Sequence, residues 1–292
     1  MRKLKKIEVL RELLNENISI LRCPVCKKSI KSIKESSVLC ENNHCFNISK
    51  KGYVNLVKNN AKTIYDKKLF ESRSKIYEYG IYDELSKEIM DIVDKYTSKK
   101  NANFVLDVGC GEGYYLNQLY SDEKINSKCK LFGIDMSREG ISLATRYENS
   151  ILWSVSDLSN LPFENGKFDI IIDILSPSNY SEFTRVLNKG GVVIKVIPDE
   201  HYLKEIRSKI KDKIKKDTYS NKNVINSFKD NLEIVYDKRI TYKTNIYNLE
   251  DFIKMTPLTS GLSKEQINEL TKCDIENITI DLKIIVGKVG KS

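Results

Sequence analysis

A cluster of cysteine and histidine residues near the N-terminus constrains the fold more than any other feature of the sequence. The segment 21-LRCPVCKKSIKSIKESSVLCENNHCFNI-48 holds four of the chain's seven cysteines and one of its two histidines. Cys23 and Cys26 form a C-P-x-C turn, and Cys40, His44 and Cys45 follow a stretch rich in Lys and Ser. Because this spacing brings ligands from two turns to one point, it predicts a tetrahedral zinc site.

The spacing leaves the fourth zinc ligand open between His44 and Cys45, and we favour His44. A redox C-x-x-C is the weaker alternative, since it would begin a helix in a βαβ unit and would leave Cys40 and His44 unexplained. Four protein ligands leave no open position for water, so the expected role of the zinc is structural rather than catalytic.

Basic charge is concentrated around this cluster. Residues 1–60 hold 13 Lys and Arg against 5 Asp and Glu, a net charge of +8, and the whole chain carries +9. This distribution is typical of a module that binds nucleic acid, and a lysine-rich solvated surface is the alternative. No apolar window approaches the roughly 18 residues of a membrane span, and the N-terminus does not have the pattern of a secretion signal. We therefore expect a cytoplasmic protein with no membrane association, whose clustered cysteines bind metal.

The rest of the chain alternates between predicted strands and helices. A polar linker is predicted at 58–68, and helical periodicity over 69–97, broken near Gly80, predicts two helices with a bend. Further strands are predicted at 37–40, 52–57, 103–109, 130–136, 151–156, 168–175, 191–197, 232–243 and 278–288, with helices starting at about 114 and 139 and others near 180–187, 200–216, 249–255 and 263–271. This order predicts an α/β domain with a doubly wound, mostly parallel sheet at 101–292, preceded by a small zinc-binding domain at 1–57 and by a linker with helices at 58–100.

A glycine turn follows the first strand of the large domain. The segment 104-FVLDVGCGEGYYLNQL-119 runs from a buried strand through Gly109, Gly111 and Gly113 into a helix that starts at Tyr114. Glycines let the backbone approach a ligand, and a helix N-terminus offers unpaired N–H groups. The third glycine comes one residue earlier than in dinucleotide sites, and this spacing behind Asp107 favours S-adenosylmethionine as the cofactor. Cys110 occupies a position in the turn that requires a small residue.

Two acidic residues at the ends of later strands extend this predicted site. Asp135 ends the second strand of the large domain, where a carboxylate can accept both hydroxyls of a ribose. Asp157 follows the third strand and is placed to accept the amine of adenine, while Leu158 packs on the ring. We assign Asp107, Gly109, Cys110, Gly111, Gly113, Tyr114, Asp135, Met136, Asp157 and Leu158 to cofactor binding.

The order of these motifs resembles the bacterial 23S rRNA guanine-N1 methyltransferases, which include tylosin-resistance relatives. The matching segments are 23-CPVC-26, 40-CENNH-44, 50-KKGYVNL-56, Arg73 with 80-GIY-82, 105-VLDVGCGEGYY-115, 161-LPF-163, 176-SP-177, 190-GG-191, 201-HYL-203 and 255-MTP-257. The resemblance implies a class I methyltransferase that uses S-adenosylmethionine to methylate N1 of a guanine in the hairpin 35 loop of 23S rRNA. It implies zinc ligands at Cys23, Cys26, Cys40 and His44, and a zinc domain that recognises rRNA, free or in an assembling large subunit. It also implies a capacity to form homodimers and a link to antibiotic resistance.

The chain departs from the family around the expected base pocket. Relatives tend to carry an aromatic-Ala-Pro-Cys stretch where this chain has 175-LSPS-178, and Asp173 replaces an arginine often found in the preceding strand. We expect Ser176 and Pro177 to form the catalytic pocket for the target base. The alternatives are methylation of another RNA or a small molecule by the same core, or a zinc-bearing RNA-binding protein without catalytic activity.

Overall fold

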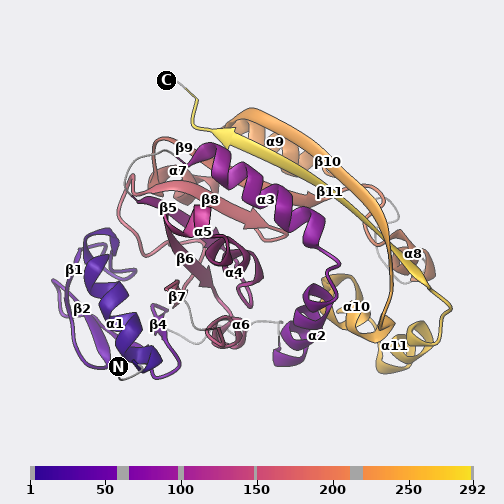
Figure 1. Ribbon diagram of the computed structural model, residues 1–292, viewed down its shortest axis with the longest axis horizontal. Helices are drawn as coiled ribbons and strands as arrows, with labels where there is room; N and C mark the ends of the chain where they lie inside the picture. The colour runs from indigo at the N-terminus through magenta and orange to yellow at the C-terminus, as the bar shows by residue number, and fades with distance from the viewer. Residues whose placement is uncertain (1–3, 58–65, 98–101, 148–149, 211–219, 291–292) are drawn as a thin grey trace.

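One sheet of 11 strands runs through the computed structural model, which describes residues 4–57, 66–97, 102–147, 150–210 and 220–290. The strand order is β1-β2-β3-β4-β7-β6-β5-β8-β9-β11-β10. The strands of the N-terminal module thus continue the sheet of the large domain (Figure 1). Most of the predicted linker, residues 58–65, and the end of the predicted Lys-rich helix, residues 211–216, lie outside the described residues.

Parallel pairing holds the middle of the sheet together. The six parallel strands are, in spatial order, β4 (Tyr53–Asn55), β7 (Leu152–Val155), β6 (Cys129–Asp135), β5 (Asn103–Val108), β8 (Phe168–Ile174) and β9 (Leu187–Pro198). Their short apolar runs are buried on both faces, as strands in the centre of an α/β sheet must be. Because they all run the same way, their carboxyl ends meet at one edge of the sheet, where such folds bind ligands.

Antiparallel strands extend the sheet on both sides, so the sheet is mixed where a mostly parallel one was predicted. On the N-terminal side lie β1 (Ile30–Ile33), β2 (Ser37–Cys40) and β3 (Cys45–Ser49), and on the other side lie β11 (Asn277–Lys288) and β10 (Glu233–Asn245). Consecutive strands joined by short turns can pair only in the antiparallel sense, which explains β1 to β4. The class I methyltransferase arrangement of the central strands is as predicted.

Helices cover both faces of the sheet and enclose two apolar cores. The helices are α1 (Lys6–Glu16), α2 (Lys67–Glu78), α3 (Asp83–Tyr96), α4 (Tyr114–Ser121), α5 (Glu123–Asn126), α6 (Arg138–Ala144), α7 (Tyr180–Val186), α8 (Lys204–Lys209), α9 (Lys222–Asn231), α10 (Leu249–Met255) and α11 (Lys264–Thr271), with short 3-10 turns η1 (Ile18–Ile20) and η3 (Pro257–Thr259). One core contains side chains of α2 to α6, α8, α10 and α11, and the other contains side chains of α1, α7 and α9. Figure 1 shows α10 beside α2, against which it packs.

The predicted elements of the large domain are present, while α1, α5, α9, β1 and β3 fall outside the predicted elements. The predicted bend between two helices lies at Gly80, whose φ of +72° separates α2 from α3. The division into domains at 1–57, 58–100 and 101–292 stays a proposal, because β4 and β7 belong to one sheet. Within the described ranges, no helix has both the length and the apolar character needed to cross a membrane.

Gly133 in β6 provides a test of how tightly the core is packed. A Cβ atom at this position would lie 2.3 Å from Cζ3 of Trp153 and 2.9 Å from Cδ1 of Leu116. Gly133→Ala is therefore expected to lower the free energy of unfolding in urea by about 1–3 kcal/mol through overpacking. Gly261→Ala is the matched control, since a Cβ atom there meets nothing within 4 Å. Equal stability of the two variants would contradict the packing around Trp153.

Candidate metal centre and cofactor site

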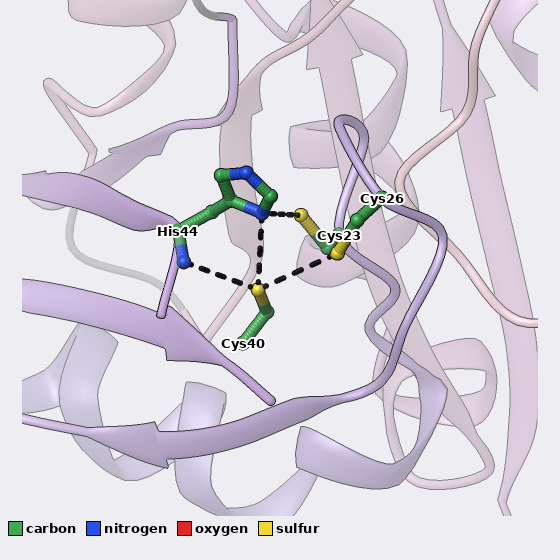
Figure 2. Close-up of side chains that lie close together, drawn as sticks. All are labelled: Cys23, Cys26, Cys40 and His44. Carbon is green, nitrogen blue, oxygen red and sulfur yellow. Dashed lines mark hydrogen bonds between the residues drawn. The ribbon is translucent and has the colours of Figure 1, made fainter. Parts of the chain in front are cut away.

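Two turns of the N-terminal module bring Cys23, Cys26, Cys40 and His44 together (Figure 2). Their three sulfurs and one ring nitrogen all lie within 4.8 Å of one another. His44 Nδ1 lies 3.7 Å from Cys23 Sγ and 3.5 Å from Cys40 Sγ, and the sulfurs of Cys26 and Cys40 are 3.7 Å apart. Zinc bonds of about 2.3 Å to sulfur and about 2.0 Å to nitrogen require ligand separations of roughly 3.5–3.8 Å in a tetrahedron. The donor set therefore fits a structural zinc ion.

Backbone geometry at each turn aims these ligands inward. Lys27 and Asn43 adopt left-handed conformations, with φ of +63° and +61°, and each lies next to a ligand in the sequence. The His44 backbone N–H donates to Cys40 Sγ over 3.3 Å, an interaction that stabilises a thiolate. Cys45 is exposed and lies outside the ligand group, so the structure brings together the four residues that were predicted.

The first of these turns contacts the loop that follows β7. Asn160 in this loop donates from Nδ2 to the backbone oxygen of Pro24 over 2.8 Å, and its Oδ1 accepts a hydrogen bond from Lys27 Nζ. The backbone N–H of Arg22 donates to the oxygen of Pro162 over 2.9 Å. The metal centre is therefore attached directly to the β7–β8 loop (residues 156–167), which contains the predicted adenine contacts. Sequence reasoning did not find Asn160.

The glycine turn has the conformation that a close approach to a ligand requires. Gly109 and Gly111 have φ of +76° and +54°, in the region that favours glycine. A Cβ atom on Gly109 would lie 2.2 Å from Ser176 Oγ, and one on Gly111 would lie 2.1 Å from Arg73 Nη2. A larger residue at either position would displace one of these side chains, and glycine lets Ser176 and Arg73 pack directly on the turn. Gly109 also lines the cavity described below.

Two of the predicted acidic residues, Asp107 and Asp135, lie on the neighbouring strands β5 and β6 at the carboxyl edge of the sheet. Asp107 is buried, and within the described part of the chain its Oδ2 has no hydrogen-bond partner. Burial, followed by the charge of Asp173, raises the pKa of Asp107 well above its ordinary value. Asp135 accepts the backbone N–H of Gly111 over 2.9 Å and that of Ser137 over 2.7 Å. Since a carboxylate has about four acceptor positions, Asp135 keeps the capacity to bind two ribose hydroxyls.

An ion pair that was not predicted fastens α2 to the glycine turn. Arg73 donates from Nε to Glu112 Oε1 over 2.9 Å and from Nη2 to Glu112 Oε2 over 2.5 Å, in a two-pronged arrangement. Burial alone would lower the pKa of Arg73, but the facing Glu112 carboxylate raises it above its ordinary value. In the sequence, the one indication of a role for Arg73 was its place among the segments that resemble the family.

Tyrosine side chains form the wall between α2, α3 and α4. The rings of Tyr77 and Tyr114 are stacked with centroids 4.1 Å apart, and the Tyr114 hydroxyl donates to Asp83 Oδ1 over 2.9 Å. Tyr115 is buried, and its hydroxyl has no partner within the described residues. Tyr114 therefore packs on protein rings while also facing the cavity, and Tyr115 offers a free polar group there.

The predicted cofactor and base residues border one large cavity of about 1690 Å³. Its lining includes Asp107, Gly109, Cys110, Tyr114, Asp135, Met136, Asp157, Leu158, Ser176 and Pro177 from the predicted site, together with Arg73, Tyr77, Tyr115, Lys195 and residues 255–258. Gly111 and Gly113 do not line it and instead shape the turn. Asp157 accepts hydrogen bonds from the backbone N–H and the hydroxyl of Ser159 through Oδ1 alone. The unpartnered groups of Asp107 and Tyr115 and the glycine cradle fit S-adenosylmethionine.

The parallel sheet, the glycine turn and the acidic residues at the strand ends define a class I methyltransferase that uses S-adenosylmethionine, with a zinc ribbon at its N-terminal end. A family model described as "Methyltransferase domain" matches residues 99–252. A second family model, described as "RlmA, N-terminal", matches residues 21–63. The two matches thus cover the zinc module and most of the sheet.

Curated relatives resemble this chain across both regions. The proposed 23S rRNA (guanine-N(1)-)-methyltransferase YxjB of Bacillus subtilis (strain 168) is 34% identical over 93% of this chain and 98% of its own length. The 23S rRNA (guanine(748)-N(1))-methyltransferase of Streptomyces fradiae is 26% identical over 65% of this chain and 67% of that protein. The protein therefore belongs to the RlmA-type family of 23S rRNA guanine-N1 methyltransferases.

Replacing one predicted zinc ligand, and separately the neighbouring non-ligand Cys45, tests which cysteines bind the metal. Cys26→Ser is expected to lose the zinc and to unfold the N-terminal module, because metal binding contributes folding free energy in such small sites. Cys45→Ser is the matched control, since Cys45 is exposed and outside the ligand group. Elemental analysis should find one zinc per chain in the parent and the control. Loss of zinc from Cys45→Ser, with retention in Cys26→Ser, would contradict the ligand assignment.

Proposed function

We propose that the protein transfers a methyl group from S-adenosylmethionine to N1 of a guanine in the hairpin 35 loop of 23S rRNA. One observation carries the proposal beyond membership of the family: the basic zinc module pairs through β4 with β7, and the loop that follows β7 lines the cavity at residues 157–159. Typical pockets for one small molecule measure about 300–1,000 Å³. A cavity of about 1690 Å³ has room for a cofactor and for a nucleotide base beside it.

The zinc module is the proposed RNA-recognition domain. Within its described residues the exposed lysines are Lys5, Lys6, Lys27, Lys28, Lys31, Lys34, Lys50 and Lys51. Phosphate contacts from such side chains provide affinity that does not depend on sequence and falls with salt. Residues 1–57 would then hold the rRNA, residues 58–100 would link and cover the site, and residues 101–292 would bind the cofactor and the base.

In this proposal, different residues bind the different parts of the cofactor. The glycine turn and Asp107 would hold the amino-acid part, Asp135 the ribose, and Asp157 with Leu158 the adenine. When bound, S-adenosylmethionine supplies an electrophilic methyl group. Around it the protein orients the base, and such positioning can be worth about 7–11 kcal/mol of the barrier. Guanine N1 carries a proton that must leave during the reaction, so the base pocket must also favour its loss.

Ser176 and Pro177 are the proposed residues of the base pocket. They lie in the turn after β8, and Ser176 Oγ faces the glycine turn at Gly109. Both line the cavity, and the preceding Leu175 has a left-handed φ of +53°. This backbone turns the Ser176–Pro177 segment across the strand end, where a target base would meet the methyl donor.

The biological setting follows from the substrate class. Free 23S rRNA and the assembling large subunit are both proposed substrates, and the cytoplasm is the proposed location because ribosomal RNA is processed there in bacteria. A homodimer that lines an RNA-sized cleft with two zinc modules is also proposed. A role in drug resistance is carried only by the tylosin-resistance relatives and forms no part of this proposal.

Mapping the methyl group tests the proposed reaction. Purified protein, 23S rRNA and labelled S-adenosylmethionine are expected to give one 1-methylguanosine in the hairpin 35 loop, seen as a reverse-transcription stop and confirmed by mass spectrometry. Transfer RNA and small-molecule pools serve as controls. Methylation confined to those pools, or to another atom of guanine, would contradict the proposal.

Substitutions in the β8 turn test the placement of the base pocket. Ser176→Ala and Pro177→Ala are expected to lower the rate of rRNA methylation by roughly tenfold or more, since small displacements of a positioned substrate are costly. Affinity for S-adenosylmethionine, measured by calorimetry, should change little. Asn188→Ala, at a position remote from the turn on β9, is the control. Wild-type rates for both pocket variants would remove Ser176 and Pro177 from the site.

A further inference from the structure

A buried ion pair links two strands beside the cavity, and of its two residues Lys195 lines the cavity. Asp173 on β8 and Lys195 on β9 are register partners, and Lys195 Nζ lies 2.9 Å from Asp173 Oδ2. The two side chains are 0% and 3% exposed. Each lies within an apolar run of its strand, 170-IIIDI-174 and 192-VVIKVI-197. Neither residue has a role in the cofactor contacts described above.

Stability alone does not account for this pair. Burying two charges costs about as much as their attraction returns, and apolar replacements are often as stable. The pair is also incompletely satisfied, because within the described residues Asp173 Oδ1 has no hydrogen-bond partner. Charged groups kept in a cavity at such a cost are candidates for functional sites.

The ammonium group of Lys195 is held in a defined orientation with one donor left over. An ammonium has three N–H donors. One is donated to Asp173 Oδ2 and a second to the backbone oxygen of Ser176, and in the described part of the chain no third acceptor is bonded. Lys195 lines the cavity, and its remaining donor is the one that a base in the pocket could accept. Ser178 Oγ donates to Asp173 Oδ2 over 2.6 Å and fixes the other side of the turn.

We propose that Lys195 is a catalytic residue that donates a hydrogen bond to O6 of the target guanine. This inference rests on the proposed function, since it names a residue for that reaction. During methyl transfer the N1–H bond breaks and its proton passes to water, the N1 electron pair forms the bond to the methyl carbon, and the electron pair of the broken carbon–sulfur bond stays on sulfur. As the proton leaves, negative charge develops on O6, and a preorganised cation at O6 stabilises it.

Asp173 has the complementary role of a positioning residue that holds the Lys195 ammonium in its orientation. Three other polar groups on neighbouring elements face Asp173: Asp107 on β5, Ser178 in the β8 turn and Tyr180 in α7. Burial is the largest cause that raises the pKa of Asp173, to about 6, while Lys195 and Ser178 act in the opposite direction. The Asp173 carboxylate faces the Lys195 ammonium as its partner in the ion pair.

Binding of modified hairpins tests the contact to O6 without relying on methyl transfer. A hairpin 35 RNA in which each loop guanine is replaced in turn by 2-aminopurine, which lacks O6 and the N1 proton, is bound to the zinc-containing protein with S-adenosylhomocysteine. The part of the preference that depends on Lys195 reports the contact to O6, since a lysine donor bonds to an acceptor and not to the N1 proton. The parent is expected to prefer guanine at one position, and Lys195→Met is expected to lose about tenfold or more of that preference, since the lost bond involves a charged donor. An equal preference in both proteins would overturn the proposal.

A second variant keeps the test valid if Lys195→Met is unstable because Asp173 is left unpaired. Asp173→Asn/Lys195→Met removes both charges and should fold, since uncharged replacements of buried pairs are often neutral. It is expected to show the same loss of preference for O6. Lys189→Met is the control, because Lys189 is exposed on the same strand. An O6 preference in the double variant that matches the parent would also overturn the proposal.

Single-turnover rates separate this inference from the proposed function. With saturating RNA and cofactor, Lys195→Met is expected to methylate about a hundredfold more slowly than the parent, the usual cost of one lost oxyanion donor. If the parent methylates the RNA but neither binding nor rate changes in Lys195→Met, the role of Lys195 is wrong and the proposed function still stands. If binding depends on O6 and on Lys195 but the parent does not methylate the RNA, the contact is supported and the proposed function is wrong.

Discussion

The parallel pairing of β4 with β7 is the interaction on which the arrangement of the site depends. Val54 and Asn55 pair with Ser154 and Val155, and the backbone N–H of Leu56 donates to Val155 over 2.9 Å. Short as it is, this pairing makes the zinc module an extension of the main sheet. A module joined in this way cannot rotate freely, so its basic surface keeps one orientation relative to the carboxyl edge.

The β7–β8 loop carries this constraint into the site. From one side the zinc turn binds Asn160, and from the other side Arg185 of α7 donates to the backbone oxygens of Leu161 over 3.0 Å and Phe163 over 2.7 Å. Each such bond contributes only about 0.5–1.5 kcal/mol, but together they leave the loop little freedom. Helix α7 directly follows the Ser176–Pro177 turn. The contacts of the β7–β8 loop therefore connect the zinc turn on one side with the proposed base pocket on the other.

The sequence predicted those parts of the site whose chemistry depends on local spacing. The cysteine and histidine cluster, the glycine turn and Asp135 required only that short motifs adopt their usual conformations. The pairing of β4 with β7 could not be predicted, since nothing in Tyr53–Asn55 selects a partner strand about 100 residues away. The same limit applies to Arg73 and Glu112, which meet only when α2 folds back over the turn. Lys195 and Asp173 did leave a signal, because each is a charge inside an apolar run of residues, but their contact depends on strand register.

Hydrogen exchange measured by mass spectrometry, with and without zinc, tests the central claim that the metal-held module forms part of the cofactor site. In zinc-loaded protein, S-adenosylhomocysteine should slow exchange at residues 107–113, in the loop at 157–163 and in the zinc turn at 22–28. Removing zinc should speed exchange in the 157–163 loop even before any cofactor is added. If the loop exchanges at the same rate with and without zinc, and the zinc turn does not respond to the cofactor, the module and the site are independent and the account is wrong.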